Sequence, residues 1–263
     1  MLWLLQSNYV DSMTSKLAWA LRRLGRPLQD FGMGFEPFNA AELCDASEPH
    51  FFYGSTGMLR QVQETPAHAA NLFGTGAALD QRTWLEHRAA DLLNADVEFI
   101  RLDDLLTRGI PVHPFFVRPA IDQKAFAGGV VEGQDMSPVY RGRRGRVREQ
   151  PDDLLLAVSP LVEGIVAEYR FVVLDGVVRL GSRYRHDNRL APSAVVPGDV
   201  LAQAQRLARG WLPCRFTVMD VAVLSDGTPR IVEFNSVHSA GLYDIDPEAF
   251  VLLAEEASSK ACR

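Results

Sequence analysis

One feature constrains the fold of this chain more than any other, a hairpin signal at Asp175-Gly176. A two-residue type I′ turn needs positive φ at both central positions, and Asp-Gly is among the pairs that adopt it. Residues 165–174 and 177–184, on either side of the turn, alternate between apolar and other side chains with the period of a strand. The sequence therefore predicts an antiparallel hairpin with one buried face.

The turn also sets a register for this hairpin. If Leu174 faces Val177, the period of two places Glu168 opposite Arg183. The charged face would then hold Glu168, Arg170, Arg179 and Arg183. The core face would hold Tyr169, Phe171, Val173, Val178, Leu180 and Tyr184. An antiparallel sheet with one solvated face gives the same alternation, so this hairpin alone leaves both a site and an ordinary exposed surface open.

A second hairpin carries oxygen ligands. Residues 217–224 and 230–235 flank an Asp-Gly-Thr-Pro turn, and pairing them across it sets Asp220 opposite Asn235, with Glu233 on the same face. These three side chains would lie within roughly 5–8 Å of one another. Carboxylates on an otherwise apolar hairpin are costly to bury without a cation. Two acids and an amide suit Mg²⁺, which adds water and substrate phosphates; ordinary surface charge is the alternative.

The first third of the chain has a different pattern. Apolar runs at residues 2–5 and 51–53 predict strands, and helical spacing at 79–93 predicts one helix between the strands of βαβ units. From Pro111 onward, strands dominate. We therefore expect an α/β N-terminal lobe over residues 1–105 and an α+β lobe with antiparallel sheets over residues 106–263.

Composition excludes several classes of protein. A net charge of -6 offers no general attraction for nucleic acid. No apolar run reaches the 18 or so residues that a membrane helix needs, so no membrane partner is expected. Cys44, Cys214 and Cys262 are scattered and lack C-x-x-C spacing, which argues against a disulfide framework or a zinc cage. A reducing cytoplasm is the expected location.

Two loops stand out for their composition. Five arginines between positions 141 and 148 form either a solvated loop or a flap whose guanidiniums meet phosphates or an acidic substrate. Residues 54–57, Gly-Ser-Thr-Gly, lack the Lys-Ser/Thr ending of a P-loop and the third glycine of a dinucleotide fingerprint. We expect them to open a helix and not to bind phosphate.

Taken in order, these elements resemble the ATP-grasp superfamily. The Asp220 strand, its turn and the run Ile231-Val232-Glu233-Phe234-Asn235 resemble its Asp…Glu-x-Asn magnesium motif. Residues 239–241, Ser-Ala-Gly, resemble the small-residue segment that follows, and residues 167–172 resemble the acid-x-Arg strand. The resemblance covers roughly residues 111–246, and it is closest to a little-characterised clade found in phages and bacteria. The order of the elements is more specific than any one motif.

The same resemblance implies nucleotide-binding residues. Residues 114–119 resemble the strand whose Lys contacts nucleotide phosphate, although here an Arg stands at that position, and 123–128 resemble the next basic loop. Residues 156–160 take the place of the adenine hinge. The residues implied to bind nucleotide are Arg118, Lys124, Val158, Ser159 and Glu168.

The activity implied is that of an ATP- and Mg-dependent ligase, which joins a small-molecule carboxylate to an amine through an acyl phosphate, with amino acids or peptides as candidate substrates. The metal would be held on the phosphates of ATP by Asp220, Glu233 and Asn235. Arg170 and Arg183 would stabilise the transferring phosphoryl group or the oxyanion, and Glu168 would orient Arg183. A phosphotransferase and a non-catalytic ATP-binding module are the alternatives. The intact acid and amide set argues against the module, and the sequence leaves the oligomeric state open.

Overall fold

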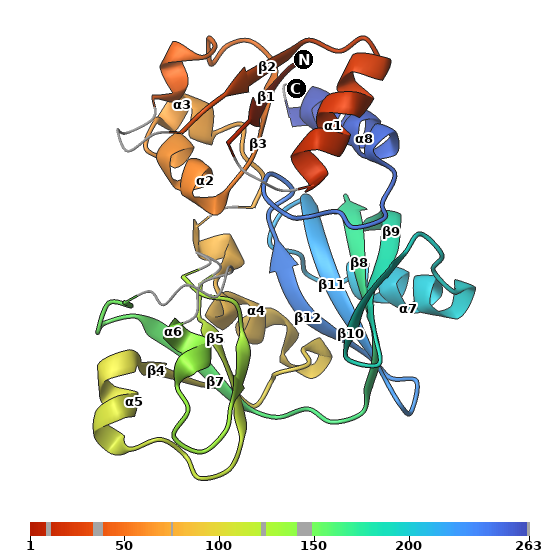
Figure 1. Ribbon diagram of the computed structural model, residues 1–263. Helices are drawn as coiled ribbons and strands as arrows, with labels where there is room; N and C mark the ends of the chain where they lie inside the picture. Colours follow the sequence, from red (N-terminus) through yellow and green to blue (C-terminus); the bar gives the residue numbers. More distant parts are fainter. Residues whose placement is uncertain (9–11, 34–38, 75, 122–124, 141–148, 262–263) are drawn as a thin grey trace.

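A computed structural model describes residues 1–8, 12–33, 39–74, 76–121, 125–140 and 149–261 (Figure 1). The chain begins with a parallel three-stranded sheet in the order β2-β1-β3. Its strands are β1 (Leu2–Gln6), β2 (Leu28–Phe31) and β3 (His50–Tyr53). The strands expected at residues 2–5 and 51–53 are thereby confirmed, as is the α/β class of this part of the chain.

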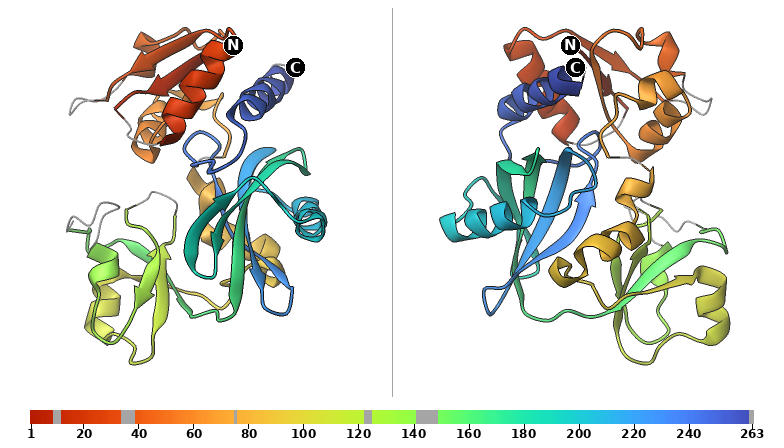
Figure 2. Two further views of the ribbon diagram at one scale, coloured as in Figure 1. Left: turned by 45° about the vertical axis from the view of Figure 1, so that its right-hand side comes forward. Right: turned by 180° about the vertical axis from the view of Figure 1, so that it is seen from behind.

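Helices cover both faces of this sheet. They are α1 (Ser12–Arg23), α2 (Thr56–Gln63) and α3 (Pro66–Ala69), with a 3-10 turn η1 (Ala40–Glu42). Residues 54–57 open α2 as expected, because the Ser55 hydroxyl accepts a hydrogen bond from the Met58 N–H at the helix N-terminus. The last helix of the chain, α8 (Pro247–Ala261), lies beside α1 in all views (Figures 1 and 2), and Arg23 pairs with Glu248 at 3.0 Å.

The middle of the chain forms an antiparallel four-stranded sheet in the order β4-β7-β5-β6. Its strands are β4 (Glu98–Arg101), β5 (Phe115–Pro119), β6 (Gly129–Val131) and β7 (Leu155–Pro160). The helices α5 (Leu102–Arg108) and α6 (Ser137–Tyr140) pack with it around a separate apolar core that includes Leu105, Val117 and Leu156.

The third sheet has five strands in the order β10-β9-β8-β11-β12 and is antiparallel throughout. Its strands are β8 (Ile165–Leu174), β9 (Val177–His186), β10 (Arg189–Ser193), β11 (Phe216–Leu224) and β12 (Pro229–Asn235). Helix α7 (Gly198–Ala208) covers the face turned away from the four-stranded sheet (Figure 2). Phe216 and Val218 of β11 pack into the core of the N-terminal sheet, so this sheet is joined to the first lobe.

The helix expected at residues 79–93 is wrong as a single element. The chain instead forms η2 (Gly76–Leu79), α4 (Gln81–Arg88) and η3 (Ala89–Asp91). Helix α4 ends at Arg88, whose buried guanidinium donates to the carbonyls of Leu207 and Trp211 at 3.0 and 2.9 Å. Tertiary hydrogen bonds therefore decide where this helix stops.

The predicted register of the first hairpin is correct only next to its turn. Leu174 pairs with Val177, but a β-bulge after Val173 shifts every later pair, so that Arg183 faces Tyr169. A second bulge brings Arg185 opposite Glu168. Bulges insert one extra residue and reverse which face the following side chains occupy. Arg183 therefore leaves the charged face, which Tyr184 joins.

A bulge also corrects the register of the second hairpin. Asp220 pairs with Glu233, and Asn235 pairs with Val218, where the sequence predicted Asp220 opposite Asn235. The extra residue lies in β12 between Ile231 and Glu233. Glu233 and Asn235 still share a face by alternation, and Asp220 joins it through its pairing with Glu233. In the part of the chain that the structure describes, no helix has both the length and the apolar character required to cross a membrane.

Candidate active site

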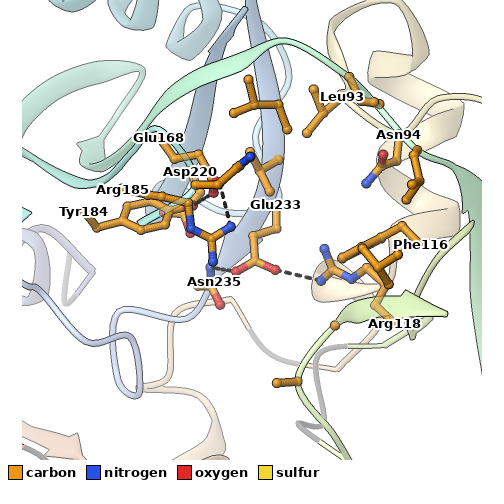
Figure 3. A pocket seen from close by; sticks show the side chains of 18 of the residues that line it. Leu93, Asn94, Phe116, Arg118, Glu168, Tyr184, Arg185, Asp220, Glu233 and Asn235 are labelled. Atoms are coloured by element: carbon orange, nitrogen blue, oxygen red, sulfur yellow. Dashed lines mark hydrogen bonds and ion pairs between the residues drawn. The ribbon is translucent and has the colours of Figure 1, made fainter. Parts of the chain in front are cut away.

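A cavity of about 1120 Å³ lies between the four-stranded and five-stranded sheets (Figure 3). Strands β5 and β12 reach it from opposite sides, and the segment 161–165 closes one end. Its described charged lining residues are Arg118, Glu163, Glu168, Arg170, Arg185, Asp187, Asp220 and Glu233. Acidic and basic side chains therefore converge on one concave site, as they do in enzymes that handle charged substrates.

The most buried charges in the cavity form one bidentate pair. Arg170 Nε lies 2.8 Å from Asp220 Oδ1, and Arg170 Nη2 lies 2.6 Å from Oδ2. Arg170 Nη1 donates to the Gly241 carbonyl at 2.5 Å, and the guanidinium carbon lies 5.0 Å from the centre of the Tyr243 ring. Neighbouring strands β8 and β11 bring the two residues face to face. The pair is a rigid block of charge in the cavity wall.

Burial dominates the titration of Asp220. It raises the pKa of this carboxyl to about 6, although the charge of Arg170 and its hydrogen bonds act in the opposite direction. At neutral pH the carboxyl is still mostly ionised. A second cation beside Asp220 would favour that ionised form further, because opposite charge offsets the cost of removing it from water.

A second ion pair spans the cavity. Arg118 Nη2 of β5 lies 2.9 Å from Glu233 Oε2 of β12, so it connects the two sheets (Figure 3). The guanidinium also lies 5.6 Å from the centre of the Trp84 ring. Asn235 Nδ2 donates to Glu233 Oε1 at 2.8 Å. Glu233 is thus shared between a guanidinium and an amide, and its side chain keeps 26% of its surface exposed, unlike that of Asp220 at 2%.

Glu168 has partners of its own. It accepts hydrogen bonds from the Tyr184 hydroxyl and, at 2.9 Å, from Arg185 Nη1. The ring of Tyr184 stacks on Tyr243 with 4.9 Å between centres, and Arg170 lies over both rings. Burial raises the pKa of Tyr184 well above its ordinary value, with Asp220 and Glu168 adding to the effect, so its hydroxyl stays protonated and donates. These contacts fix Glu168 beside Arg170.

The donor set fits a magnesium ion. Asp220, Glu233 and Asn235 all line the cavity, and they offer two carboxylates and one amide oxygen. The Asn235 amide nitrogen is used by Glu233, so its oxygen is turned to other partners. Both carboxylates already face guanidiniums, which shows that this surface requires positive charge. Hard oxygen donors in small number are what Mg²⁺ takes from proteins that also bind phosphates to it.

Other residues predicted for the site lie elsewhere. Arg183 donates from Nε to the Ala191 carbonyl at 3.2 Å and is not among the lining residues. Val158 and Ser159 are buried within β7, opposite Val117 and Phe116, and the cavity is lined instead by the residues just after them. Lys124 and the loop 141–148 fall outside the described residues. Roles for these residues in nucleotide binding or catalysis remain predictions.

Sequence reasoning missed four residues of the cavity wall. Tyr184 and Arg185 reach it because of the bulges in β9, and Tyr243 reaches it from a turn in which its own φ is 53°. Phe116 lies on β5 next to Arg118. The alternation pattern assigned Tyr184 to the core, and no local signal in the sequence marks the bulges.

Comparison with known proteins agrees with this geometry. Residues 97–253 match the model of an ATP-grasp domain, the second family of its clade, whereas no curated protein matches the chain. A phosphoribosylamine–glycine ligase from Thermotoga maritima is similar in structure, with a TM-score of 0.63 and 13% identity over 98% of this chain and 75% of that one.

Two further solved structures are similar in fold. The first, a RimK domain ATP-grasp protein from Sphaerobacter thermophilus, has a TM-score of 0.59 and 14% identity over 98% of this chain and 99% of that one. The second is the ATP-grasp ligase PsnB in complex with a minimal precursor, Mg and ADP, with a TM-score of 0.52 and 14% identity over 99% and 96%. The family match covers more than half of the residues, and the chain therefore belongs to the ATP-grasp family.

Proposed function

We propose that this protein is an ATP-dependent ligase that joins a carboxylate to an amine through an acyl phosphate. One observation carries the proposal. Asp220, Glu233 and Asn235 share a single cavity with the guanidiniums of Arg118 and Arg170. Membership of the ATP-grasp family supports ATP as a substrate, and proteins of similar fold include named ligases.

The two ion pairs suggest how the nucleotide is received. Asp220, Glu233 and Asn235 would hold Mg²⁺, which neutralises charge on the β- and γ-phosphates during phosphoryl transfer. Arg118 and a cation compete for the same Glu233 carboxylate, so loading the site releases the Arg118 guanidinium from it. The released guanidinium then binds phosphate oxygens, for which its planar fork is suited.

The chemical steps balance with the groups at hand. A substrate carboxylate oxygen attacks the γ-phosphorus, the bond from that phosphorus to the bridging oxygen breaks, and ADP leaves. The amine then attacks the acyl carbon, a C–N bond forms, and inorganic phosphate departs as the nitrogen loses a proton to solvent. Arg170 is held in place by Asp220 and Gly241, so its fixed positive charge faces the oxygens on which negative charge develops.

Trapping the acyl phosphate tests this proposal. Hydroxylamine should yield a hydroxamate when ATP, Mg²⁺ and the correct carboxylic acid from an amino-acid and peptide panel are present. Arg170→Lys, which keeps the charge but loses the bidentate geometry, should lower the rate by about 10²- to 10³-fold. Arg179→Ala is the matched control, because this arginine of the same hairpin pairs with Glu256 at the surface, 2.8 Å away.

Three outcomes separate the candidate functions. Hydroxamate and ADP in equal amounts support the ligase. A stable phosphorylated hydroxyl product, with no hydroxamate and no amide from any acceptor, would replace it with a phosphotransferase. Binding of ATP with no ADP release across the whole panel would indicate a nucleotide-binding module.

A further inference from the structure

A second group of ligand-type side chains lies in the N-terminal lobe. One ligand atom from each of Cys44, His50 and His68 lies within 4.8 Å of the other two. Cys44 follows η1, His50 begins β3, and His68 belongs to α3, so three separate segments meet at this point. None of the three lines the active-site cavity. The fold alone brings them together, because 5 and 17 residues separate them in sequence.

The tautomer of His50 leaves one nitrogen ready to bind. Its Nδ1 lies 2.7 Å from the Glu48 carbonyl, and a carbonyl only accepts, so Nδ1 carries the proton. The Nε2 atom of the neutral ring therefore has a lone pair to offer, and it lies 3.2 Å from His68 Nδ1. Metal-binding histidines commonly donate their second N–H to a backbone carbonyl in this way. His50 is thus oriented as a ligand.

The spacing agrees with a tetrahedral metal. Zinc binds imidazole nitrogen at about 2.0–2.1 Å, so two nitrogens on a tetrahedron lie roughly 3.3 Å apart. The observed separation between His50 Nε2 and His68 Nδ1 is 3.2 Å. Zinc binds thiolate sulfur at about 2.3 Å, which places sulfur roughly 3.6 Å from each nitrogen. The Cys44 sulfur is within 4.8 Å, so the loop that carries it needs to move by only about 1 Å.

Burial and access also suit a bound ion. His50 and His68 are buried against the ring of Phe52, at 5.3 and 6.0 Å between ring centres. Burial lowers the pKa of His68, and His50 adds to the effect, which keeps the ring neutral and able to coordinate. Cys44 is half-buried in an exposed loop, so an ion can enter from that side. A hydrogen-bonded histidine pair would need no thiol; the third donor is what makes this a metal site.

We propose that Cys44, His50 and His68 bind one Zn²⁺ ion, with water as the fourth ligand. A donor set of one sulfur and two nitrogens selects zinc over magnesium, so this site is chemically distinct from the hard-oxygen set of the cavity. The ion would fasten residues 43–49 to β3 and α3. Cysteine spacing argued against a zinc cage, and it could not reveal a site in which histidines supply two of three donors.

Cobalt titration of tag-free, chelator-treated protein tests the proposal, since Co²⁺ is a spectroscopic substitute for zinc. We expect one Co²⁺ per chain, a thiolate-to-cobalt charge-transfer band in the near ultraviolet, and loss of that band when Zn²⁺ is added. Zinc should also raise the melting temperature. Cys44→Ser should abolish the band, and His68→Gln should weaken binding at least tenfold.

Two variants serve as controls. Cys214→Ser should keep the band, because burial raises the pKa of Cys214 to about 11 and its thiol is occupied by the Phe216 carbonyl. His87→Gln, which removes a histidine stacked on Trp211, should bind as the wild type does. The proposal is overturned if folded wild-type protein binds no cobalt stoichiometrically, or binds it without a thiolate band. A band that survives in Cys44→Ser overturns it as well, and the wild-type arm decides the matter even if a variant fails to fold.

Discussion

Two buried polar networks of the molecule are built from opposite chemistry. The cavity network is charged, with Arg170 paired to Asp220 and Arg118 paired to Glu233. The junction network, between the N-terminal sheet and the five-stranded sheet, is neutral and is centred on His238. His238 Nδ1 donates to the Phe52 carbonyl at 2.8 Å, and Nε2 accepts from the Phe73 N–H at 2.9 Å.

The difference follows from what each network has to do. Every ring nitrogen of His238 has a protein partner, and burial lowers its pKa to about 4, so the ring is neutral at physiological pH. Such a network holds two layers together and has no charge to exchange. In the cavity, by contrast, each carboxylate faces a guanidinium that a charged ligand can replace or use. Buried charge is thus concentrated where exchange is proposed, and neutral hydrogen bonds are used where the lobes stay joined.

Removing Arg170 should have the largest effect on stability. Arg170→Ala leaves the Asp220 carboxylate buried without its partner, which should lower the free energy of unfolding by about 3–5 kcal/mol. Urea denaturation at neutral pH measures this. Arg179→Ala, which breaks an exposed pair, should change the same quantity by less than about 1 kcal/mol. Equal losses in the two variants would contradict the distinction between buried and exposed pairs.

Acid should act on the junction network. The unfolded chain protonates His238 below about pH 6.5, whereas the folded chain does so only near pH 4. The contribution of His238 to stability is therefore complete above pH 6.5 and is lost as the pH falls toward 4, by roughly 3 kcal/mol. Asp220, with its raised pKa, titrates in part of this range with the opposite sign.

A difference measurement isolates the histidine. Denaturation of the wild type and of His238→Gln at several pH values between 4 and 7 gives the stability difference between the two proteins. That difference should shrink as the pH falls, because only the wild type loses the contribution of a neutral ring. A difference that stays constant across the range would show that His238 does not titrate as its burial implies.

The inter-sheet pair should matter less than the buried one. Arg118→Ala removes a charged hydrogen bond to Glu233, which keeps some access to water, and we expect a loss of about 1–3 kcal/mol. The same variant should weaken Mg-ATP binding, because a phosphate ligand is lost. Calorimetric titration measures the second effect. An unchanged affinity for Mg-ATP would remove Arg118 from the proposed phosphate clamp.

The smallest effect should come from the rim of the cavity. Arg185→Ala removes a half-exposed partner of Glu168, which keeps its hydrogen bond from Tyr184. The free energy of unfolding should change by less than about 1 kcal/mol. Thermal denaturation is sufficient to check this, and a loss comparable to that of Arg170→Ala would place Arg185 within the buried network.

Local signals in the sequence predicted the elements but not their registers. The Asp175-Gly176 pair predicted a tight turn, and both residues have positive φ in the structure. The alternation in the flanking strands predicted the hairpin, but bulges moved Arg183 to the opposite face and brought Tyr184 and Arg185 to the cavity. One reason for the shifted pairing is Gly181, where a Cβ would lie 2.6 Å from the Phe171 ring. Contacts of this kind depend on tertiary packing, which no short window of sequence contains.

The candidate metal ligands were predicted better than the arginines. Asp220, Glu233 and Asn235 share a cavity although their predicted pairing was wrong, because a bulge of one residue in β12 offset the error in register. Arg118 was predicted from a family resemblance, and its partner Glu233 could not be, since the two lie on different sheets. The Cys44, His50 and His68 group was missed entirely, because its members are distant in sequence.

The magnesium-dependent binding of ATP tests the account of the cavity most directly. At 100 times its dissociation constant, a ligand of the native state adds about 2.7 kcal/mol of stability, so Mg-ATP should raise the melting temperature well above the effect of ATP with a chelator. Asp220→Asn and Glu233→Gln should lose the magnesium-dependent part of this shift. Glu163→Gln, a change of another acid of the cavity wall, should keep it. If both ligand variants retain the full shift, the metal assignment and the proposed exchange at Glu233 are wrong.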